Sequence, residues 1–466
     1  METFDTIIIG TGQAAGTLLS SLIPNESSIA VIEGGKPGGS CVNHGCTPTK
    51  TLVASAKAIH TARQGAEYGF EGGPARVDFN RIRERMNDIR NGSKEGMTQW
   101  LENTENVTFI RNWAHFTGPD TVKAGNREIR GKKIIINTGT RASVPPIPGL
   151  DRVSWLDNAG ILDLAELPAH LVIIGGGYIG IEFAQVFRRF GSEVTILQRG
   201  SQVMPREDAD VAEAIRKFLE KEGISVHLET ETKRVREDER GVAIETEGPG
   251  GPASLNGSHL FVATGRKPNS DRLNPEAAGI STDQKGFIRV DDHCRTGVEG
   301  IFAVGDVNGK GAFTHTSVND GEVLLDYLFD GPRKVSHRTP VYALFTDPPL
   351  GRVGMTEKEA VQSGKRVLKA EMPMSKISRA REMSETTGFV KLLVDADTDL
   401  ILGASILGIG GDEIIGMFAA LIQAQVPCST FRQTVLVHPT VAELMPWILD
   451  RLQPVSTPPP TTTSSR

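Results

Sequence analysis

The sequence predicts an α/β protein with two Rossmann-like parallel-sheet domains and a C-terminal domain of the α+β kind. Three observations lead to this prediction. Residues 5–33 and 171–199 each run from an apolar strand through a glycine-rich turn and a helix into a second strand, which is the βαβ unit of a parallel sheet. From about residue 338 onward, strand and helix patterns mix without a glycine fingerprint. The length of 466 residues also suits about three domains.

The first βαβ unit has the pattern of a dinucleotide-binding turn. Gly10 allows a tight turn after the strand, Gly12 lets the backbone approach a pyrophosphate, and Ala15 lets the helix pack closely. Glu33 ends the second strand, where an acidic side chain can bind ribose hydroxyls. A glycine-rich turn without a ligand is the alternative, and the complete strand, turn, helix, strand and terminal acid argue against it. The predicted binding residues of this turn are Gly10, Gly12, Gln13, Ala14, Ala15 and Glu33.

The second βαβ unit differs at its terminal acid. It ends in Gln198 and Arg199, and Arg206 follows. An acid would bind the ribose hydroxyls of NAD and repel a 2′-phosphate, whereas an arginine attracts that phosphate. The unit therefore predicts a preference for NADPH over NADH; the alternative is an arginine that is merely exposed at a strand end. The predicted binding residues of its turn are Gly175, Gly177, Tyr178, Ile179 and Gly180.

Composition and charge exclude several classes of function. The chain has 51 Lys and Arg against 57 Asp and Glu, a net charge of −6, so the basic footprint of a nucleic-acid or polybasic membrane binder is missing. The most apolar run, residues 171–187, contains three consecutive glycines and two polar side chains, which does not suit a membrane helix. The first residues lack the basic start of a signal peptide. We expect a cytoplasmic protein that binds neither nucleic acid nor membrane.

Two of the four cysteines, Cys41 and Cys46, lie five residues apart. A bridge across so short a loop would add only about 2 kcal/mol by the chain-entropy model, so stability is a poor reason for the pair. Such a pair in a reducing cytoplasm is more often redox-active or metal-binding, and no second Cys/His cluster supplies the remaining ligands of a metal site. Pro48 fits the first turn of a helix, whose N-terminus would favour a thiolate at Cys46. We name no metal ligands and expect Cys294 and Cys428 to be inert core residues.

The segment 39–50, with Cys41, Cys46, Pro48 and Lys50, resembles the active-site segment of class I flavoprotein disulfide reductases. That family includes dihydrolipoyl dehydrogenase, glutathione reductase and mercuric reductase. Further motifs follow in the order of the family, so that the resemblance covers about residues 4–452. The residues that resemble FAD motifs are Gly39, Ser40, Thr138, Gly139, Gly305, Asp306 and Thr314, with His115 expected to meet the adenine region through its backbone. The other matches are Gly177–Glu182, Gly265 and Arg266 for the nicotinamide coenzyme, 345–348 for the start of the interface domain, and His438–Glu443 for the acid–base motif.

The resemblance implies a homodimer that passes electrons from NADPH through FAD to a Cys41–Cys46 disulfide. Cys46 would be the charge-transfer thiolate beside the flavin, and Cys41 would attack the substrate, because exchange needs a thiolate attacker and a protonated leaving group. The implied acid–base is His438 of the partner subunit, oriented by Glu443. The alternative for this histidine is an ordinary surface position.

Two further roles follow from the same resemblance. Lys50 and Glu182 would form an ion pair beside the flavin ring, and Tyr178 would gate the nicotinamide pocket. The resemblance also divides the chain into domains. We expect a FAD-binding domain with the redox disulfide over 1–148, an NAD(P)H-binding domain over 149–270, a second part of the FAD-binding domain over 271–334, an interface domain over 335–452 and a disordered Pro/Thr/Ser-rich tail over 453–466.

Departures from the family patterns leave the electron acceptor open. Gln13 and Ser20 stand where a glutathione reductase would have Ser and Arg, and the last cysteine is Cys428, whereas mercuric reductases usually add a C-terminal cysteine pair. The second site lacks the acid expected of an NAD-using dihydrolipoyl dehydrogenase. A small-molecule disulfide is the leading prediction. The alternatives are a soft metal ion or a quinone reduced on the same scaffold, and a non-enzymatic subunit that keeps only the fold, against which the intact active-site residues argue.

His44 lies between the two cysteines, where the family generally has an apolar or small residue. One hypothesis is that His44 modulates a thiolate or lends a ligand to a soft metal ion held by Cys41. The alternative is a structural histidine that is turned away from the thiols.

Overall fold

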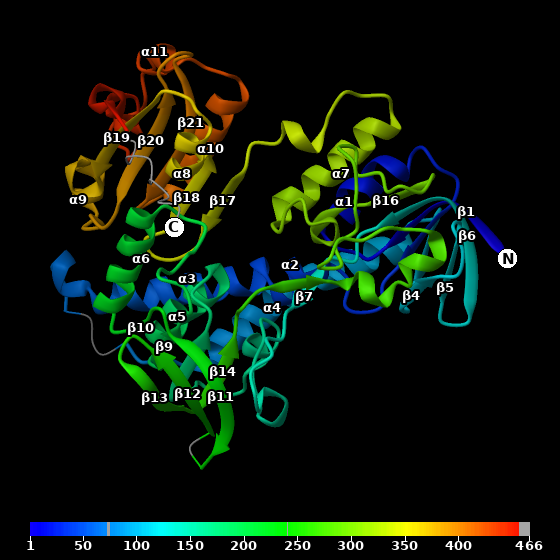
Figure 1. Ribbon diagram of the computed structural model, residues 1–466, viewed down its shortest axis with the longest axis horizontal. Helices are drawn as coiled ribbons and strands as arrows, with labels where there is room; N and C mark the ends of the chain where they lie inside the picture. The colour runs from blue at the N-terminus through cyan, green and yellow to red at the C-terminus, as the bar shows by residue number, and fades with distance from the viewer. Residues whose placement is uncertain (72–74, 240, 456–466) are drawn as a thin grey trace, which may run out of the picture.

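The computed structural model describes residues 1–71, 75–239 and 241–455. Figure 1 shows three sheet-containing parts: the N-terminal sheet on the right, the green sheets below left and the C-terminal sheet above left. Long helices of the N-terminal part run through the middle, from the N-terminal sheet toward the left, between the C-terminal part above and the green sheets below (Figure 1). This confirms the α/β fold with two parallel-sheet domains and an α+β C-terminal domain.

The first sheet comprises β1 (Glu2–Ile9), β2 (Ile29–Ile32), β3 (Val107–Ile110), β4 (Ala114–Phe116), β5 (Thr121–Ala124), β6 (Arg127–Ile136) and β16 (Ile301–Ala303). Its order is β3-β2-β1-β6-β5-β4, and β16 pairs in parallel with β6. The strands β1, β2, β3 and β6 are parallel, and β4 and β5 return antiparallel at one edge. The helices α1 (Gln13–Leu22) and α7 (Thr314–Leu328) pack against each other and share one buried core with β1. Residues almost three hundred apart in sequence therefore meet beside the first glycine turn.

The second parallel sheet has the order β10-β9-β8-β14. Its elements are β8 (His170–Ile174), α5 (Tyr178–Phe190), β9 (Glu193–Leu197), α6 (Ala209–Lys221), β10 (Ser225–His227) and β14 (His259–Val262). An antiparallel sheet of β11 (Glu231–Asp238), β12 (Gly241–Gly248) and β13 (Gly251–Gly257) lies beside it. A short ladder of β7 (Thr140–Ala142) and β15 (Arg266–Pro268) ties the chain after β6 to the chain after β14.

The C-terminal sheet is antiparallel, with the order β17-β18-β21-β20-β19-β22. Its elements are β17 (Val341–Leu344), β18 (Leu350–Gly354), α8 (Glu357–Gln362), β19 (Val367–Pro373), α9 (Ser378–Glu382), β20 (Phe389–Asp395), β21 (Leu400–Leu407), α10 (Gly411–Gln423), α11 (Cys428–Phe431) and β22 (Gln453–Pro454). The strand β22 takes the first two residues of the segment predicted as a tail into the sheet, and residues 456–466 of that segment lie outside the described residues.

Three helices position the cysteine pair. They are α2 (Gly39–His44), α3 (Cys46–Arg63) and α4 (Phe79–Asn103). The helix α3 packs against both α4 and α5, and Leu52 and Ala56 share a core with Ile181 and Phe187. This packing brings the start of α3, which belongs to the first domain, against the first helix of the second domain.

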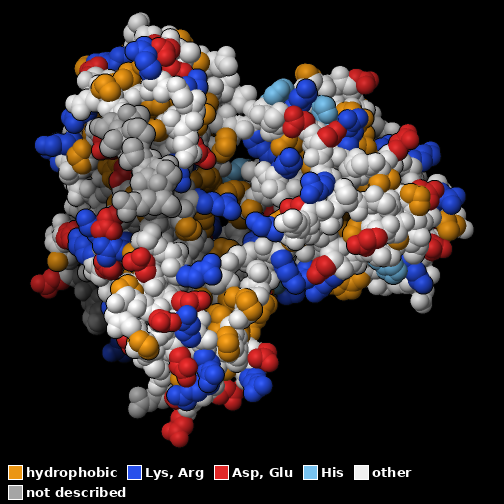
Figure 2. All heavy atoms as spheres, viewed as in Figure 1, with side chains coloured by type: hydrophobic (Ala, Val, Ile, Leu, Met, Phe, Trp, Pro, Cys, Tyr) orange, Lys and Arg blue, Asp and Glu red, His pale blue; other side chains and the backbone are white. Residues whose placement is uncertain are grey.

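Short 3-10 turns connect many of these elements: η1 (Gly65–Tyr68), η2 (Leu150–Arg152), η3 (Gly160–Asp163), η4 (Asn269–Arg272), η5 (Pro275–Ala278), η6 (Gly305–Asn308), η7 (Val335–His337), η8 (Met374–Lys376), η9 (Ala442–Leu444) and η10 (Pro446–Arg451). Within the described ranges, every helix is too short or too polar to cross a membrane. In the space-filling view, the surface is hollowed between the lobes, and Lys and Arg side chains gather along this hollow (Figure 2).

Candidate active site

The first glycine turn leaves the N-terminus of α1 open. Gly10 has a φ of +100°, and a Cβ there would collide with the backbone carbonyl of Asn137. Gly39, with a φ of +63°, lies so close that a Cβ would be 2.8 Å from the Cα of Gly12. Gly12 caps α1 without any side-chain hydrogen bond, so the first amide N–H groups of the helix remain available. This arrangement is a ready anion site for a pyrophosphate.

The other predicted residues of this turn divide into two groups. The Ala14 and Ala15 side chains are fully buried and pack the helix rather than face a ligand. The Gln13 amide donates a 3.2 Å hydrogen bond to the carbonyl of Gly38. The carboxylate of Glu33 accepts hydrogen bonds from the amide and hydroxyl of Thr11, at 2.9 and 2.6 Å. Glu33 therefore lies directly beside the turn, where a ribose would follow the pyrophosphate.

The later FAD motifs meet this turn from the other side. Thr138 has a buried hydroxyl with no hydrogen-bond partner among the described residues, although buried polar groups are nearly always paired. Asp306, in η6, accepts a 2.7 Å hydrogen bond from the Thr140 hydroxyl. The amide of Gly305 donates to the carboxylate of Asp320, which fixes η6 to α7. An unpaired buried hydroxyl, an open helix N-terminus and an acid at a strand end are donors and acceptors that fit a flavin dinucleotide.

Arg266, predicted from a coenzyme motif, lies with the FAD residues. Its guanidinium donates to the hydroxyl and carbonyl of Thr140, at 2.7 and 2.6 Å, and lies 3.9 Å from Asp306 and 3.4 Å from the Ser40 hydroxyl. Burial lowers the pKa of Arg266. The β7–β15 ladder causes this placement, because it pairs the strand after Gly265 with the strand after Gly139, with Arg266 opposite Ala142 and Pro268 opposite Thr140.

The two cysteines flank the junction of α2 and α3. The pKa of Cys41 is raised, first by its hydrogen bond to Cys46 and then by burial. The pKa of Cys46 is lowered from 9.0 to about 6, first by the hydrogen bond from Cys41, then by the Thr314 hydroxyl and the charge of Lys50. The Sγ of Cys46 lies 3.3 Å from the Oγ1 of Thr314. The pair therefore separates into a thiolate at Cys46 and a protonated thiol at Cys41.

An ion pair stands one helical turn from Cys46. The ammonium of Lys50 donates to both carboxylate oxygens of Glu182, at 2.8 and 2.9 Å. The backbone amide of Phe345 donates a further 2.9 Å hydrogen bond to Glu182, and Lys50 lies 4.4 Å from the centre of the Phe345 ring. The Glu182 side chain is only 6% exposed. The structure thus brings residues of all three domains together beside Cys46.

The second glycine turn has a similar geometry, with one difference. Gly177 caps α5 without a side-chain hydrogen bond, Gly175 and Gly180 pack closely against each other, and Ile179 packs into the core. The Gln198 side chain, however, accepts a 3.0 Å hydrogen bond from the amide of Gly176 and so occupies one donor of the turn. Arg199 and Arg206 are both exposed.

Tyr178, the first residue of α5, belongs to an aromatic group. Its ring packs edge-on against Phe313 and Tyr342, with centroids 5.8 and 5.5 Å away. Its hydroxyl lies 3.3 Å from the buried carboxylate of Glu207. The sequence prediction missed Phe313, Tyr342 and Glu207 because the three lie in different segments without a shared motif.

Three histidines singled out by the sequence make no hydrogen bond to Cys41 or Cys46 among the described residues. His438 forms a 2.7 Å hydrogen bond to Glu443, and its side chain is 76% exposed. His115 lies half-buried in the edge strand β4, on the first sheet. His44 has its pKa lowered by burial and by Lys36, and its Nδ1 has no hydrogen-bond partner among the described residues.

The strongest electrostatic influences on His44, besides Lys36, come from Asp163, Arg90 and Asp157. Neither cysteine is among these groups, and the role of His44 stays a hypothesis. Asn137 is a residue that sequence reasoning missed: its side-chain amide donates to the carbonyls of Gly10 and Gly12, at 3.2 and 3.1 Å. A polar residue at the end of the apolar run 134–136 was the available signal.

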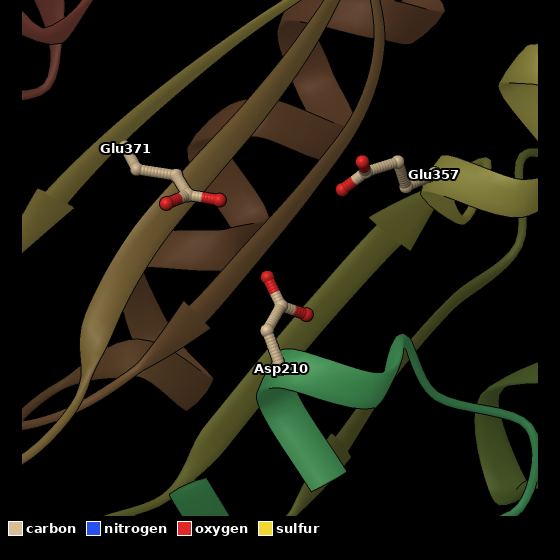
Figure 3. Close-up of side chains that lie close together, drawn as sticks. All are labelled: Asp210, Glu357 and Glu371. Carbon is tan, nitrogen blue, oxygen red and sulfur yellow. The ribbon is translucent and has the colours of Figure 1, made fainter. Parts of the chain in front are cut away.

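A separate acidic group lies between α6, α8 and β19. Asp210, Glu357 and Glu371 point toward one another, with one oxygen of each within 4.8 Å of the others (Figure 3). Lys391 lies 2.8 Å from Asp210 and 3.4 Å from Glu357, and Lys369 lies 3.2 Å from both glutamates. Two ammonium groups therefore already contact the three carboxylates.

Comparison with known proteins supports the geometry. The model of the pyridine nucleotide-disulphide oxidoreductases matches residues 4–321, and the model of their dimerisation domain matches residues 341–449. The chain is 38% identical over 452 residues to the probable pyridine nucleotide-disulfide oxidoreductase RclA of Escherichia coli K12, covering 95% of this chain and 98% of that protein. It is 31% identical to a mercuric reductase of Bacillus cereus, covering 94% of this chain and 70% of that protein.

A dihydrolipoyl dehydrogenase of Geobacillus stearothermophilus is 30% identical, with 94% of both chains covered. Among solved structures, a Cu(II) complex of the HOCl-induced flavoprotein disulfide reductase RclA from Escherichia coli superposes with a TM-score of 0.86 at 37% identity, covering 96% of this chain and 98% of that one. The two family models follow one another along the chain and together span most of the sequence. They agree with the geometry of the site. The chain therefore belongs to the pyridine nucleotide-disulphide oxidoreductases.

Proposed function

We propose that the chain is an NADPH-dependent, FAD-containing disulfide reductase that acts as a homodimer through Cys41 and Cys46. The observation that carries this proposal is the separation of the two thiols, with the pKa of Cys46 lowered to about 6 and that of Cys41 raised. Such a separation suits two different roles. A thiolate is stable at Cys46 at neutral pH, while Cys41 keeps its proton until a base removes it.

FAD, when bound, supplies the two-electron link between nicotinamide and the disulfide. The open N-terminus of α1 would hold its pyrophosphate and Glu33 its ribose, and Asp306 lies in η6 close to the start of α7. Lys50, fixed by Glu182, places a positive charge beside Cys46 and favours its anionic form. The Thr314 hydroxyl stabilises the same thiolate from α7.

The chain's residues then carry the exchange. The Cys41 thiol loses its proton to His438 of the partner subunit, and its sulfur attacks one sulfur of the substrate disulfide. The S–S bond of the substrate breaks, and the leaving sulfur takes the proton from the same imidazole. The Cys46 thiolate then attacks the Cys41 sulfur of the mixed disulfide and releases the second substrate thiolate, which regenerates the Cys41–Cys46 disulfide. Glu443 orients the imidazole through its 2.7 Å hydrogen bond.

The choice of NADPH rests on the end of β9. Arg199 follows Gln198 where a NAD site would have an acid, and both Arg199 and Arg206 are exposed and free to meet a 2′-phosphate. A reducing compartment such as the cytoplasm suits the chain, since Cys294 and Cys428 are buried as free thiols.

A soft metal ion is the second candidate acceptor. The mercuric reductases among the relatives and the Cu(II) complex of RclA favour it, since two adjacent sulfur ligands suit soft cations. A screen of NADPH oxidation over low-molecular-weight disulfides, mercuric and cupric ions and quinones separates the candidates. In the Cys41→Ser variant we expect disulfide reduction to vanish while electron transfer to an artificial dye persists. Full turnover of the physiological disulfide by Cys41→Ser would overturn the proposal.

A further inference from the structure

Glu207 is a buried carboxylate between β9 and α6. Its side chain is 0% exposed. Its Oε1 accepts a 2.6 Å hydrogen bond from the hydroxyl of Tyr342 and a 3.3 Å hydrogen bond from that of Tyr178. Its Oε2 has no hydrogen-bond partner among the described residues, and Arg352 lies 3.9 Å away. A buried charge that is satisfied so incompletely costs stability, so the fold alone gives no reason for it.

Tyr178 connects this carboxylate to the reacting groups. Tyr178 and Glu182 are four residues apart on α5 and therefore share one face of the helix, and Glu182 pairs with Lys50. On its other side, the Tyr178 ring packs 5.8 Å from the ring of Phe313. Phe313 directly precedes Thr314, whose hydroxyl contacts the thiolate-forming cysteine. The ring thus contacts the neighbour of Thr314, and its hydroxyl reaches Glu207.

The other partners of Glu207 come from the interface domain. Tyr342 lies in β17 and Arg352 in β18, while Glu207 follows the second βαβ unit. The Tyr342 ring stacks on Phe313 at 5.6 Å and meets Tyr178 edge-on at 5.5 Å. The carboxylate therefore holds two hydroxyls from two domains at one point, and the aromatic packing leaves Tyr178 little freedom while that hydrogen bond exists.

We propose that Glu207 is a positioning residue for the coenzyme: by accepting the Tyr178 hydroxyl it holds the ring closed over the place that the nicotinamide takes. This inference rests on the proposed function and on the gating role that the family resemblance implies for Tyr178. The Tyr178 ring must move aside for each coenzyme molecule. The hydrogen bond from its hydroxyl to the charged Glu207 sets how easily the ring moves. Burial raises the pKa of Glu207, while the Tyr342 hydroxyl and the charge of Arg352 act in the opposite direction. Asp208 also faces the group and raises that pKa.

The test measures flavin reduction by NADPH in the FAD-loaded dimer under stopped flow. In Tyr178→Phe, which removes the donor, we expect the half-saturating NADPH concentration to fall about three- to tenfold, as loss of one hydrogen bond would give. Glu207→Gln keeps an acceptor oxygen but removes its charge, so we expect a smaller fall in the same direction. The limiting rate should change less than about twofold, because the reacting groups stay in place. The double variant should match Tyr178→Phe, since without the hydroxyl the change at Glu207 has no hydrogen bond left to weaken.

Two control variants carry the same chemical changes elsewhere. Tyr327→Phe removes a hydroxyl that contacts Arg295, and Glu213→Gln neutralises an exposed partner of Arg216; both should leave the half-saturating concentration unchanged. If the Glu207→Gln variant fails to hold FAD, Glu207→Asp replaces it in the comparison of single and double variants. Wild-type protein that NADPH does not reduce contradicts the proposed function. Normal wild-type reduction with no shift in the variants, or with shifts that multiply in the double variant, overturns the role of Glu207 alone.

Discussion

At Cys46, three neighbours stabilise a negative charge on one sulfur. The hydrogen bond from Cys41, the Thr314 hydroxyl and the Lys50 charge lower the pKa of Cys46 from 9.0 to about 6. The thiolate of the reduced protein should therefore persist from pH 8 down to about pH 6 and disappear below it. Because the folded-state pKa is depressed, the contribution of this group to stability is present above the unfolded pKa and is lost as the pH falls through 6.

Absorbance of the reduced protein against pH measures this directly, through the thiolate band and the long-wavelength charge-transfer band. Thr314→Val removes one stabilising hydroxyl and should move the midpoint upward by about half a unit to one unit. Thr430→Val, an exposed threonine of α11, is the matched control and should leave the midpoint in place. A midpoint near 9 in the wild type would show that these neighbours do not act on Cys46.

The Lys50–Glu182 pair makes a second prediction for single residues. Lys50→Met leaves the Glu182 carboxylate, 6% exposed, with the amide of Phe345 as its remaining donor. We expect a loss of about 1–3 kcal/mol in the free energy of unfolding, because a buried acceptor loses its charged partner. Denaturant titration of the FAD-loaded protein measures it. The double variant Lys50→Met/Glu182→Leu should lose less than Lys50→Met alone; an equal or larger loss would show that the pair does not act as a unit.

Among the elements, the βαβ units were the most predictable. Each has a short-range pattern in which strand, turn and helix occupy one continuous segment, so Gly10, Gly12 and Glu33 could be placed from the sequence alone. The β7–β15 ladder was not predictable, because each strand has three residues and they lie more than one hundred residues apart. That ladder places Arg266 against Thr140 and Asp306, whereas its motif pointed to the coenzyme. The pattern of a short segment does not encode such pairing.

The β8-α5-β9 unit carries the prediction on coenzyme choice. Arg199→Glu at the end of β9 restores an acid where NAD sites have one, and it should raise the KM for NADPH more than tenfold while lowering that for NADH. Steady-state kinetics with both coenzymes and one dye acceptor measure the ratio. Arg206→Ala tests the second arginine in the same assay. Unchanged KM values for both coenzymes in both variants would show that the phosphate binds elsewhere.

For the whole molecule, the meeting of three domains decides the site, and this is where sequence patterns give the least information. Lys50, Glu182 and Phe345 come from three domains and meet because α3 packs on α5 and the chain before β18 lies against both. The resemblance to a family predicted the Lys50–Glu182 pair. Nothing local predicted Glu207 or Tyr342, since their meeting depends on how the second and third domains dock.

The expected role of His438 also depends on the whole molecule, because it involves a second subunit. Its imidazole is 76% exposed, and Val435 and Val437 beside it are 94% and 73% exposed. Apolar side chains left in solvent beside the His438–Glu443 pair indicate a surface that a second subunit covers, which agrees with the match to the dimerisation domain. We therefore expect His438 to serve the Cys41–Cys46 pair of the partner, in an isologous dimer in which each subunit completes the other's site.

Subunit mixing tests this expectation. Cys41→Ser and His438→Ala homodimers should each lack disulfide reductase activity. Dimers reassembled from equal amounts should recover about one quarter of wild-type activity, because half of them are mixed and each mixed dimer has one intact site. In the converse mixture, a chain with both substitutions is combined with wild type. If His438 acts in trans, every mixed dimer is inactive and about one quarter of the activity remains; if it acts within its own chain, about one half remains. A site shared between subunits therefore requires about one quarter of the activity in both mixtures.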